Sequence, residues 1–161
     1  ADGLNCVVGK LDKLTGRQKH MVFTPHPGEM ARLTGLSSNE IQANRVDAAR
    51  NFSIKHNLWL VLKGAASISS SPGGEIYVNA SGNPWMASGG QGDVLSGILG
   101  GLLAQGLGTQ VAVPLGVFMH GTLADMIVND HGARPVLAMD VVDRIPNYLS
   151  ELARITFKTT G

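Results

Sequence analysis

Five consecutive apolar residues, 58–62 (LWLVL), constrain the fold more than any other feature of this chain. A strand that is apolar at every position is covered on both faces, as in a sheet between two layers of helices. The run 21–24, closed by Pro25, predicts a second buried strand. Segments 67–71 and 75–79 flank Pro72-Gly73-Gly74, which predicts a β-hairpin.

Helices are expected between and after these strands. Their predicted ranges are 27–33, 39–56, 93–105, 110–129 and 139–153. In the second helix, apolar residues recur at helical spacing, and Ser38 or Asn39 is the expected cap. Three glycines, Gly97, Gly100 and Gly101, fall inside the third helix. Each costs roughly 1 kcal/mol relative to alanine, so close packing against another element is expected to compensate. Strands that alternate with helices predict an α/β sandwich with a largely parallel sheet.

Length and composition favour one soluble domain. The chain has 161 residues, which we divide into a domain over residues 1–154 and a tail over 155–161. Thirteen lysines and arginines balance twelve acidic residues, so no nucleic-acid surface is indicated. A single cysteine, Cys6, fits a reducing compartment. No pattern typical of a signal peptide or membrane span is found, and we expect a cytoplasmic protein.

The densest chemical signal is a glycine-rich segment that leads into the third predicted helix, Gly89-Gly90-Gln91-Gly92-Asp93. Glycines let main-chain N–H groups approach an anion, and a helix N-terminus adds unpaired N–H groups and its positive dipole end. A carboxylate at Asp93 could take a proton from a hydroxyl that is being phosphorylated. The residues alone equally allow a tight turn in which Asp93 only caps the helix.

Two further segments add candidate ligand contacts. Lys63 and Gly64 follow the buried strand 58–62, and ligands of open α/β sheets bind at the carboxyl ends of strands. Pro25 and Pro27 restrict the backbone on either side of His26, at the start of a helix. The alternatives are a surface lysine and a rigid turn with a solvent-facing histidine.

Other chemistries are not supported by the residue patterns. No histidine pair has the spacing of a zinc site, and we expect His20, His56, His120 and His131 to be structural or exposed. Neither a Walker-type phosphate loop nor a dinucleotide-binding Gly-x-Gly-x-x-Gly fingerprint occurs.

Taken in order, three segments resemble the bacterial NAD(P)H-hydrate dehydratases: Thr24 through Leu33, then Val61-Leu62-Lys63-Gly64, then Gly82-Asn83-Pro84 through Leu95. His120-Gly121 and Ala124-Asp125 match a later helix of that family. The glycine-Asp motif alone marks the wider ribokinase-like superfamily. Related vitamin and sugar kinases have Asn-x-x-Glu where this chain has His26-Pro27-Gly28-Glu29, and this favours the dehydratase over a kinase.

The resemblance implies a ribokinase-like three-layer α/β/α sandwich and a metabolite-repair reaction. ADP, or ATP, would phosphorylate the hydroxyl of hydrated NADH or NADPH, and loss of phosphate would restore the reduced nicotinamide. Mg²⁺ would accompany the nucleotide, and Glu29 would help organise it indirectly. Members of the family begin well before the residue that matches Ala1, so we expect the N-terminal part of the domain to be absent. Family likeness also suggests a homotetramer.

The same resemblance assigns roles to individual residues. Asp93 would be the catalytic base and a substrate contact, and His26 would contact the substrate. The nucleotide phosphates would bind to a set of residues in two loops: Lys63, Gly64, Ala65, Ala66, Ser67, Gly89, Gly90 and Gly92. Two other functions remain open, a ribokinase-like small-molecule kinase and a nucleotide-binding module without catalysis.

Overall fold

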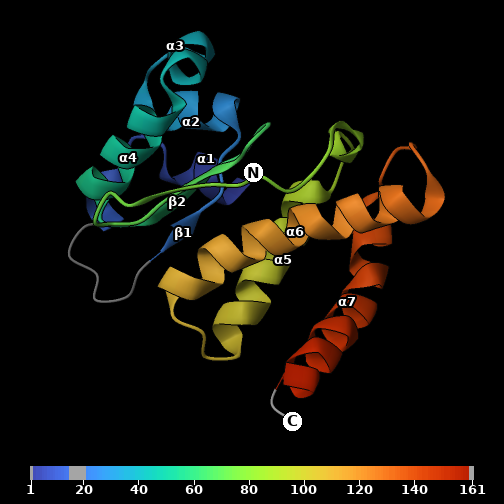
Figure 1. Ribbon diagram of the computed structural model, residues 1–161. Helices are drawn as coiled ribbons and strands as arrows, with labels where there is room; N and C mark the ends of the chain where they lie inside the picture. Colours follow the sequence, from blue (N-terminus) through green and yellow to red (C-terminus); the bar gives the residue numbers. More distant parts are fainter. Residues whose placement is uncertain (1, 15–20, 160–161) are drawn as a thin grey trace.

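The computed structural model describes residues 2–14 and 21–159. These residues form one four-stranded sheet between two groups of helices (Figure 1). The N-terminal elements are α1 (Asp2–Val7), the short helix η1 (Leu11–Leu14), β1 (Val22–Phe23), α2 (Pro27–Thr34), α3 (Ser38–Ala43) and α4 (Arg45–His56). The remaining elements are β2 (Trp59–Leu62), β3 (Ile68–Ser70), β4 (Ile76–Val78), the short helix η2 (Pro84–Met86), α5 (Gln91–Ala104), α6 (Thr109–His131) and α7 (Ala138–Thr159).

The sheet has the strand order β1-β2-β3-β4. Strands β1 and β2 are parallel, whereas β2–β3 and β3–β4 are antiparallel. The predicted hairpin is confirmed, but the expectation of a largely parallel sheet is wrong for the described residues. The cause is local. Only residues 63–67 join β2 to β3, too few for a parallel crossover, and the turn Pro72-Gly73-Gly74, in which Gly74 has φ 86°, folds β4 directly back onto β3.

Strand β2 is buried on both faces, as its sequence predicts. Leu60 and Leu62 pack with side chains of α2, α3 and α4, whereas Trp59 and Val61 pack with α5 and α6. Alternate residues of a strand point to opposite faces, so one short strand contributes to two cores. Figure 1 shows helices α1 to α4 on one side of the sheet and α5 and α6 on the other. The predicted three-layer arrangement is therefore confirmed.

Helix α6 is the central element of the C-terminal half. By length and composition it could cross a membrane, and 56% of its most apolar window is buried inside the protein. It packs between α5 and α7 through a cluster that includes Met119, Leu123, Ile127 and Val141. Packing of this kind is typical of the core helix of a globular domain.

The helix predicted over residues 39–56 is two helices. Ser37 caps α3 through a capping box with Glu40, in place of the expected Ser38 or Asn39. Asn44, with φ −136° and ψ 48°, ends α3, and Arg45 begins α4. This break determines where Arg45 lies, as described below.

Three further expectations need adjustment. Helix α5 begins two residues earlier than predicted, at Gln91. A Cβ added at Gly97, Gly100 or Gly101 would have no heavy atom within 4 Å, so the expected close packing against these glycines is wrong for the described residues. Close approaches occur instead on α6, where a Cβ on Gly116 would lie 2.7 Å from the Leu99 side chain. Helix α7 continues past residue 154 to Thr159, and the tail predicted over 155–161 ends outside the described residues.

Candidate functional site

The three segments singled out in the sequence meet at one edge of the sheet. Because β1 and β2 are parallel, the chain leaves both strands at the same edge. The N–H of Lys63 donates to the carbonyl of Pro25 over 2.8 Å, which ties the segment after β2 to the segment after β1. The start of α5 lies beside them, as the contacts of Lys63 show.

His26 is the N-cap of α2. Its Nδ1 accepts hydrogen bonds from the N–H groups of Gly28 at 3.1 Å and Glu29 at 3.3 Å. In return, Glu29 Oε2 accepts from the His26 N–H at 2.7 Å, which completes a capping box. An Nδ1 that accepts carries no proton, so the ring proton of neutral His26 is on Nε2. The side chain is 51% exposed, and its Nε2 lies 3.6 Å from Glu29 Oε2.

Glu29 links His26 to Lys63. The Nζ of Lys63 lies 3.7 Å from Glu29 Oε2, and the Glu29 side chain is only 4% exposed. Burial by itself would raise the pKa of Glu29. The hydrogen bond from the His26 N–H and the charge of Lys63 outweigh burial and hold this pKa below its ordinary value. Glu29 is therefore a carboxylate at neutral pH, and it fixes a buried negative charge beside a lysine.

Lys63 also reaches the start of α5. A Cβ built on Gly92 would lie 3.1 Å from Lys63 Nζ, so glycine at this position lets the ammonium approach the helix backbone. Gly90 is the N-cap of α5, with φ 85°. Among the described residues, no hydrogen bond is donated by the N–H groups of Gly90, Gln91 and Gly92. Unpaired N–H groups at a helix N-terminus, next to an ammonium, are suited to bind an anion, and we call this place the candidate anion site.

Asp93 occupies the third position of α5. Its N–H donates to the Gly90 carbonyl over 3.0 Å, and its side chain is exposed. The alternative that Asp93 only caps α5 requires a side-chain hydrogen bond at the N-cap. The N-cap of α5 is Gly90 and has no such bond among the described residues. The side chain thus remains free to meet a ligand at the candidate anion site.

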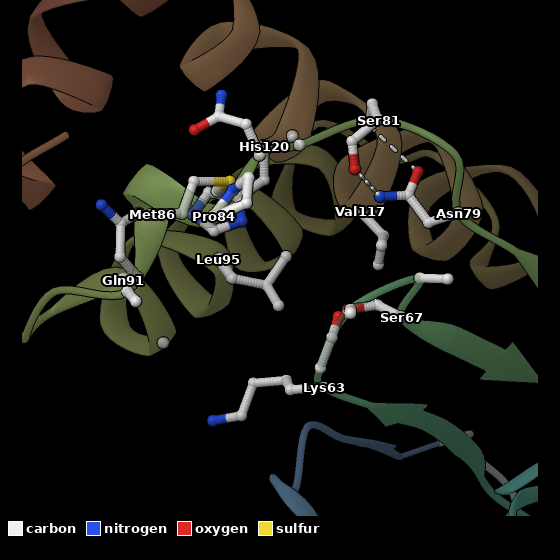
Figure 2. A pocket seen from close by; sticks show the side chains of 18 residues that line it. Lys63, Ser67, Asn79, Ser81, Pro84, Met86, Gln91, Leu95, Val117 and His120 are labelled. Carbon is white, nitrogen blue, oxygen red and sulfur yellow. Dashed lines mark hydrogen bonds between the residues drawn. The ribbon is translucent and has the colours of Figure 1, made fainter. Parts of the chain in front are cut away.

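A cavity of about 500 Å³ opens next to the candidate anion site. Figure 2 shows Lys63 and Ser67 on one side, and Gln91, Leu95, Val117 and His120 from α5 and α6 on the other. Among the predicted nucleotide contacts, those that line the cavity are Lys63, Gly64, Ala65, Ala66, Ser67 and Gly92. The predicted residues that do not line it are His26, Gly89, Gly90 and Asp93. Gly89, Gly90 and Asp93 lie beside lining residues along the chain, whereas His26 is linked to Lys63 through Glu29.

His120 lines the same cavity, although sequence reasoning placed it among structural or exposed histidines. Its Nε2 lies 2.9 Å from Gln91 Oε1. The Gln91 amide nitrogen donates to the carbonyl of Val136 at 2.9 Å, and this carbonyl can only accept. The Gln91 oxygen must then face His120, so the ring proton of His120 is on Nε2. Burial lowers the pKa of His120 to about 4, and the ring is neutral at pH 7.

The loop between β4 and α5 is held by α6. Both carboxylate oxygens of Asp125 accept hydrogen bonds at 2.8 Å, one from the Gly82 N–H and the other from the Asn83 amide. Ser81 Oγ donates to the Phe118 carbonyl over 2.8 Å, where the absence of a side chain on Gly121 admits the loop. The wall of the cavity therefore depends on contacts between segments about 40 residues apart.

No group of three or more histidine, cysteine, aspartate or glutamate side chains among the described residues could hold a metal ion. Glu29 Oε2 is already engaged by the His26 N–H and Lys63. Mg²⁺ usually keeps several waters and binds through substrate phosphates and one or two carboxylates. The residues present fit a magnesium ion that arrives on a nucleotide and meets Glu29 indirectly.

The sequence is similar to a family described as NAD(P)H-hydrate dehydratase, whose model matches residues 1–147. The bifunctional NAD(P)H-hydrate repair enzyme Nnr of Moorella thermoacetica is 42% identical over 152 residues, which are 94% of this chain and 29% of that protein. The ADP-dependent (S)-NAD(P)H-hydrate dehydratase of Neisseria meningitidis is 45% identical over 114 residues, 71% of this chain and 38% of that protein.

A solved structure shares the fold. The ADP/ATP-dependent NAD(P)H-hydrate dehydratase of Bacillus subtilis, co-crystallised with ATP and Mg²⁺, superposes with a TM-score of 0.80 at 33% identity. The match covers 84% of this chain and 49% of that structure. The chain thus spans half or less of the length of these relatives.

Proposed function

Because the chain belongs to the NAD(P)H-hydrate dehydratase family, we propose that the full-length protein restores hydrated NADH or NADPH with the help of ADP or ATP. In this reaction the β-phosphate of ADP would be transferred to the hydroxyl on the nicotinamide ring, and AMP would leave. The C–O bond to the phosphate would then break, a proton would be lost from the ring, and the reduced nicotinamide would form again. The observation that carries the proposal is that Lys63 Nζ lies beside both the Glu29 carboxylate and the backbone of Gly92.

The nucleotide would lie in the cavity, with its phosphates toward the start of α5. Lys63 and Gly92 line the cavity and lie against each other, so an anion placed there meets an ammonium and unpaired N–H groups together. Gly89 and Gly90 precede this point and would extend the same main-chain cradle. Positioning and electrostatic stabilisation supply most of the rate acceleration in phosphoryl transfer.

Asp93 would be the general base. It lies one residue after Gly92, and its exposed carboxylate is not used by the helix cap. A hydroxyl that attacks a phosphoryl group at the start of α5 would come within reach of this carboxylate, which would accept the hydroxyl proton.

His26 would bind the hydrated dinucleotide. The N–H groups of Gly28 and Glu29 fix its ring through Nδ1, which leaves Nε2–H, on a half-exposed side chain, as the donor that would meet the substrate. Because Glu29 lies between His26 and Lys63, the substrate contact and the nucleotide contact are linked by one carboxylate. Mg²⁺ would supply charge neutralisation on the phosphates, and Glu29 would influence it through water.

The test uses the full-length protein with hydrated NADH, ADP and Mg²⁺, and follows the absorbance of the reduced nicotinamide. We expect the absorbance to return only when all three are present. Robust phosphorylation of a vitamin precursor or sugar, without any return of absorbance, would favour the ribokinase-like kinase. Nucleotide binding with neither reaction would favour a non-catalytic module.

The remaining parts of the proposal concern the location and the oligomeric state of the protein. A cytoplasmic location fits the nucleotides that it would use, and a homotetramer is the assembly that the family resemblance implies. Sedimentation equilibrium of the full-length protein measures the assembly directly. A monomer would remove the tetramer from the proposal and leave the chemistry unaffected.

A further inference from the structure

Arg45 contacts the backbone of the loop that follows β2. Its Nη1 donates to the carbonyl of Ala65 at 2.5 Å, and its Nη2 donates to the carbonyl of Leu62 at 3.2 Å. The two carbonyls lie on either side of Lys63 and Gly64. One planar guanidinium therefore spans the segment that would bind the nucleotide phosphates.

The loop is shaped to admit this guanidinium. Gly64 has φ 148°, and a Cβ added to it would lie 3.0 Å from Arg45 Nη2. Ala66 has φ 51°, a left-handed conformation that is uncommon for a residue with a side chain. Both departures from ordinary backbone occur in the three residues that Arg45 faces, which is typical of a loop shaped for binding.

In the loop after β2, side chains of the described residues bind the main-chain carbonyls but not the main-chain N–H groups. Arg45 engages the carbonyls of Leu62 and Ala65, and Ser67 Oγ donates to the carbonyl of Gly64 at 3.1 Å. In contrast, within the described part of the chain, the N–H groups of Gly64, Ala65 and Ala66 donate no hydrogen bond. These three residues line the cavity. A run of unpaired N–H groups in a turn that includes a left-handed residue attracts anions.

The stability of α4 does not explain why an arginine lies here. Arg45 is the first residue of α4, where the helix dipole disfavours a cation. Its Nε is buried and has no hydrogen-bond partner among the described residues. Both features cost stability, so a role outside the helix is the simpler account of this arrangement.

We propose that Arg45 is a positioning residue for the nucleotide, and this inference rests on the proposed function. It holds the carbonyls of the loop away from the cavity, so that the N–H groups of Gly64, Ala65 and Ala66 face the phosphates. Arg45 itself does not touch the reacting atoms. Without it, the loop carbonyls are free to turn toward the cavity, where they would repel an anion.

Arg50 offers a matched control on the same helix. Its Nε donates to the carbonyl of Gly74 over 3.2 Å, so it too holds a loop after a strand, but at the β3–β4 hairpin. The experiment compares Arg45→Gln, Arg45→Lys and Arg50→Gln in the full-length protein. It measures the dissociation constant of ADP by calorimetry, the KM of each substrate, kcat and the midpoint of thermal unfolding.

We expect Arg45→Gln to raise the dissociation constant and the KM of ADP roughly tenfold, which corresponds to about 1.4 kcal/mol. The KM of the hydrated dinucleotide and kcat should stay within about twofold of wild type, because Arg45 acts on the nucleotide loop alone. Arg45→Lys should lose most of the same affinity, because an ammonium cannot span both carbonyls. Arg50→Gln should bind ADP as wild type does.

Three outcomes would overturn the inference. Equal ADP affinity in Arg45→Gln and Arg50→Gln would show that the loop does not need Arg45. Wild-type ADP affinity in Arg45→Lys would show that a positive charge suffices without a guanidinium that binds both carbonyls. A wild-type protein that does not bind ADP would remove the proposed function and this inference together, whereas the first two outcomes remove the inference alone.

Discussion

The Nζ of Lys63 lies 3.7 Å from Oε2 of Glu29. The carboxylate belongs to the first turn of α2 and the ammonium follows β2, so the pair joins two segments that the sequence separates by more than 30 residues. Glu29 is almost fully buried, and Lys63 faces both Gly92 and the cavity. The pair therefore fixes the direction of a cation that a flexible side chain would otherwise not hold.

Replacing Lys63 by alanine should weaken nucleotide binding more than binding of the hydrated dinucleotide. The lost contact is a charge-assisted hydrogen bond to phosphate, worth about 1–3 kcal/mol. Calorimetric titration with ADP measures the effect. Lys55→Ala, an exposed lysine on α4, is the control and should bind ADP normally. Equal ADP affinity in both variants would remove Lys63 from the phosphate site.

Replacing Asp93 by asparagine should abolish turnover and leave nucleotide binding intact. Asparagine has nearly the same shape but cannot accept the hydroxyl proton, and loss of a general base costs about 10²–10⁴-fold in rate. The measurement pairs kcat with the dissociation constant of ADP. Asp143→Asn, an exposed aspartate on α7, controls for the charge change. Unchanged turnover would exclude Asp93 as the base.

Part of this site could be predicted because its signals are local. A continuous apolar run predicts a strand buried on both faces, and β2 is such a strand. Glycines before a helix predict free N–H groups, and the start of α5 has them. The hairpin followed from Pro72-Gly73-Gly74 for the same reason.

Other features depend on contacts between distant segments. His120 is neutral because the fold buries it, and its partner Gln91 is held by the carbonyl of Val136, so nothing within a few residues of His120 indicates this. The N-cap of α2 is a histidine, a residue outside the usual capping set, so the cap was not expected. The position of Arg45 was not predicted, because the sequence pattern is helical without interruption over residues 39–56. The break at Asn44 makes Arg45 the first residue of α4, where it contacts the loop after β2.

Replacing Gly121 by alanine should destabilise the loop between β4 and α5. The new Cβ would lie 2.6 Å from the main-chain carbon of Ser81 and 2.8 Å from the Gly82 nitrogen, so the loop must move. We expect a loss of about 1–3 kcal/mol in the free energy of unfolding, measured with urea, together with weaker ADP binding.

The control for this substitution is Gly100→Ala on α5. A Cβ there meets no heavy atom within 4 Å, so alanine should raise the free energy of unfolding by up to about 1 kcal/mol. If both alanine variants gained stability, the close approach of the loop to α6 would be contradicted.

The stability of the protein should fall as the pH falls below the ordinary pKa of histidine, because of His120. Burial lowers its pKa from 6.5 to about 4 in the folded state. Between these values the unfolded chain binds a proton that the folded chain does not, so protonation favours unfolding. The stabilisation is complete above pH 6.5 and is lost progressively toward pH 4. One such group changes the free energy of unfolding by at most about 1.4 kcal/mol per pH unit.

Urea unfolding of wild type and His120→Gln between pH 7 and 5 measures this slope. The interval lies above the range in which Glu29, whose pKa is lowered from 4.5, gains its proton. His56, whose pKa burial also lowers, adds a slope of the same sign in both proteins, so the difference between them isolates His120. In His120→Gln we expect the free energy of unfolding to depend less steeply on pH, by about 0.5–1 kcal/mol per pH unit. This figure allows for the partial exposure of His120 to solvent. Identical slopes would mean that the folded protein admits a proton on His120, and the Gln91 contact would then not require a neutral ring.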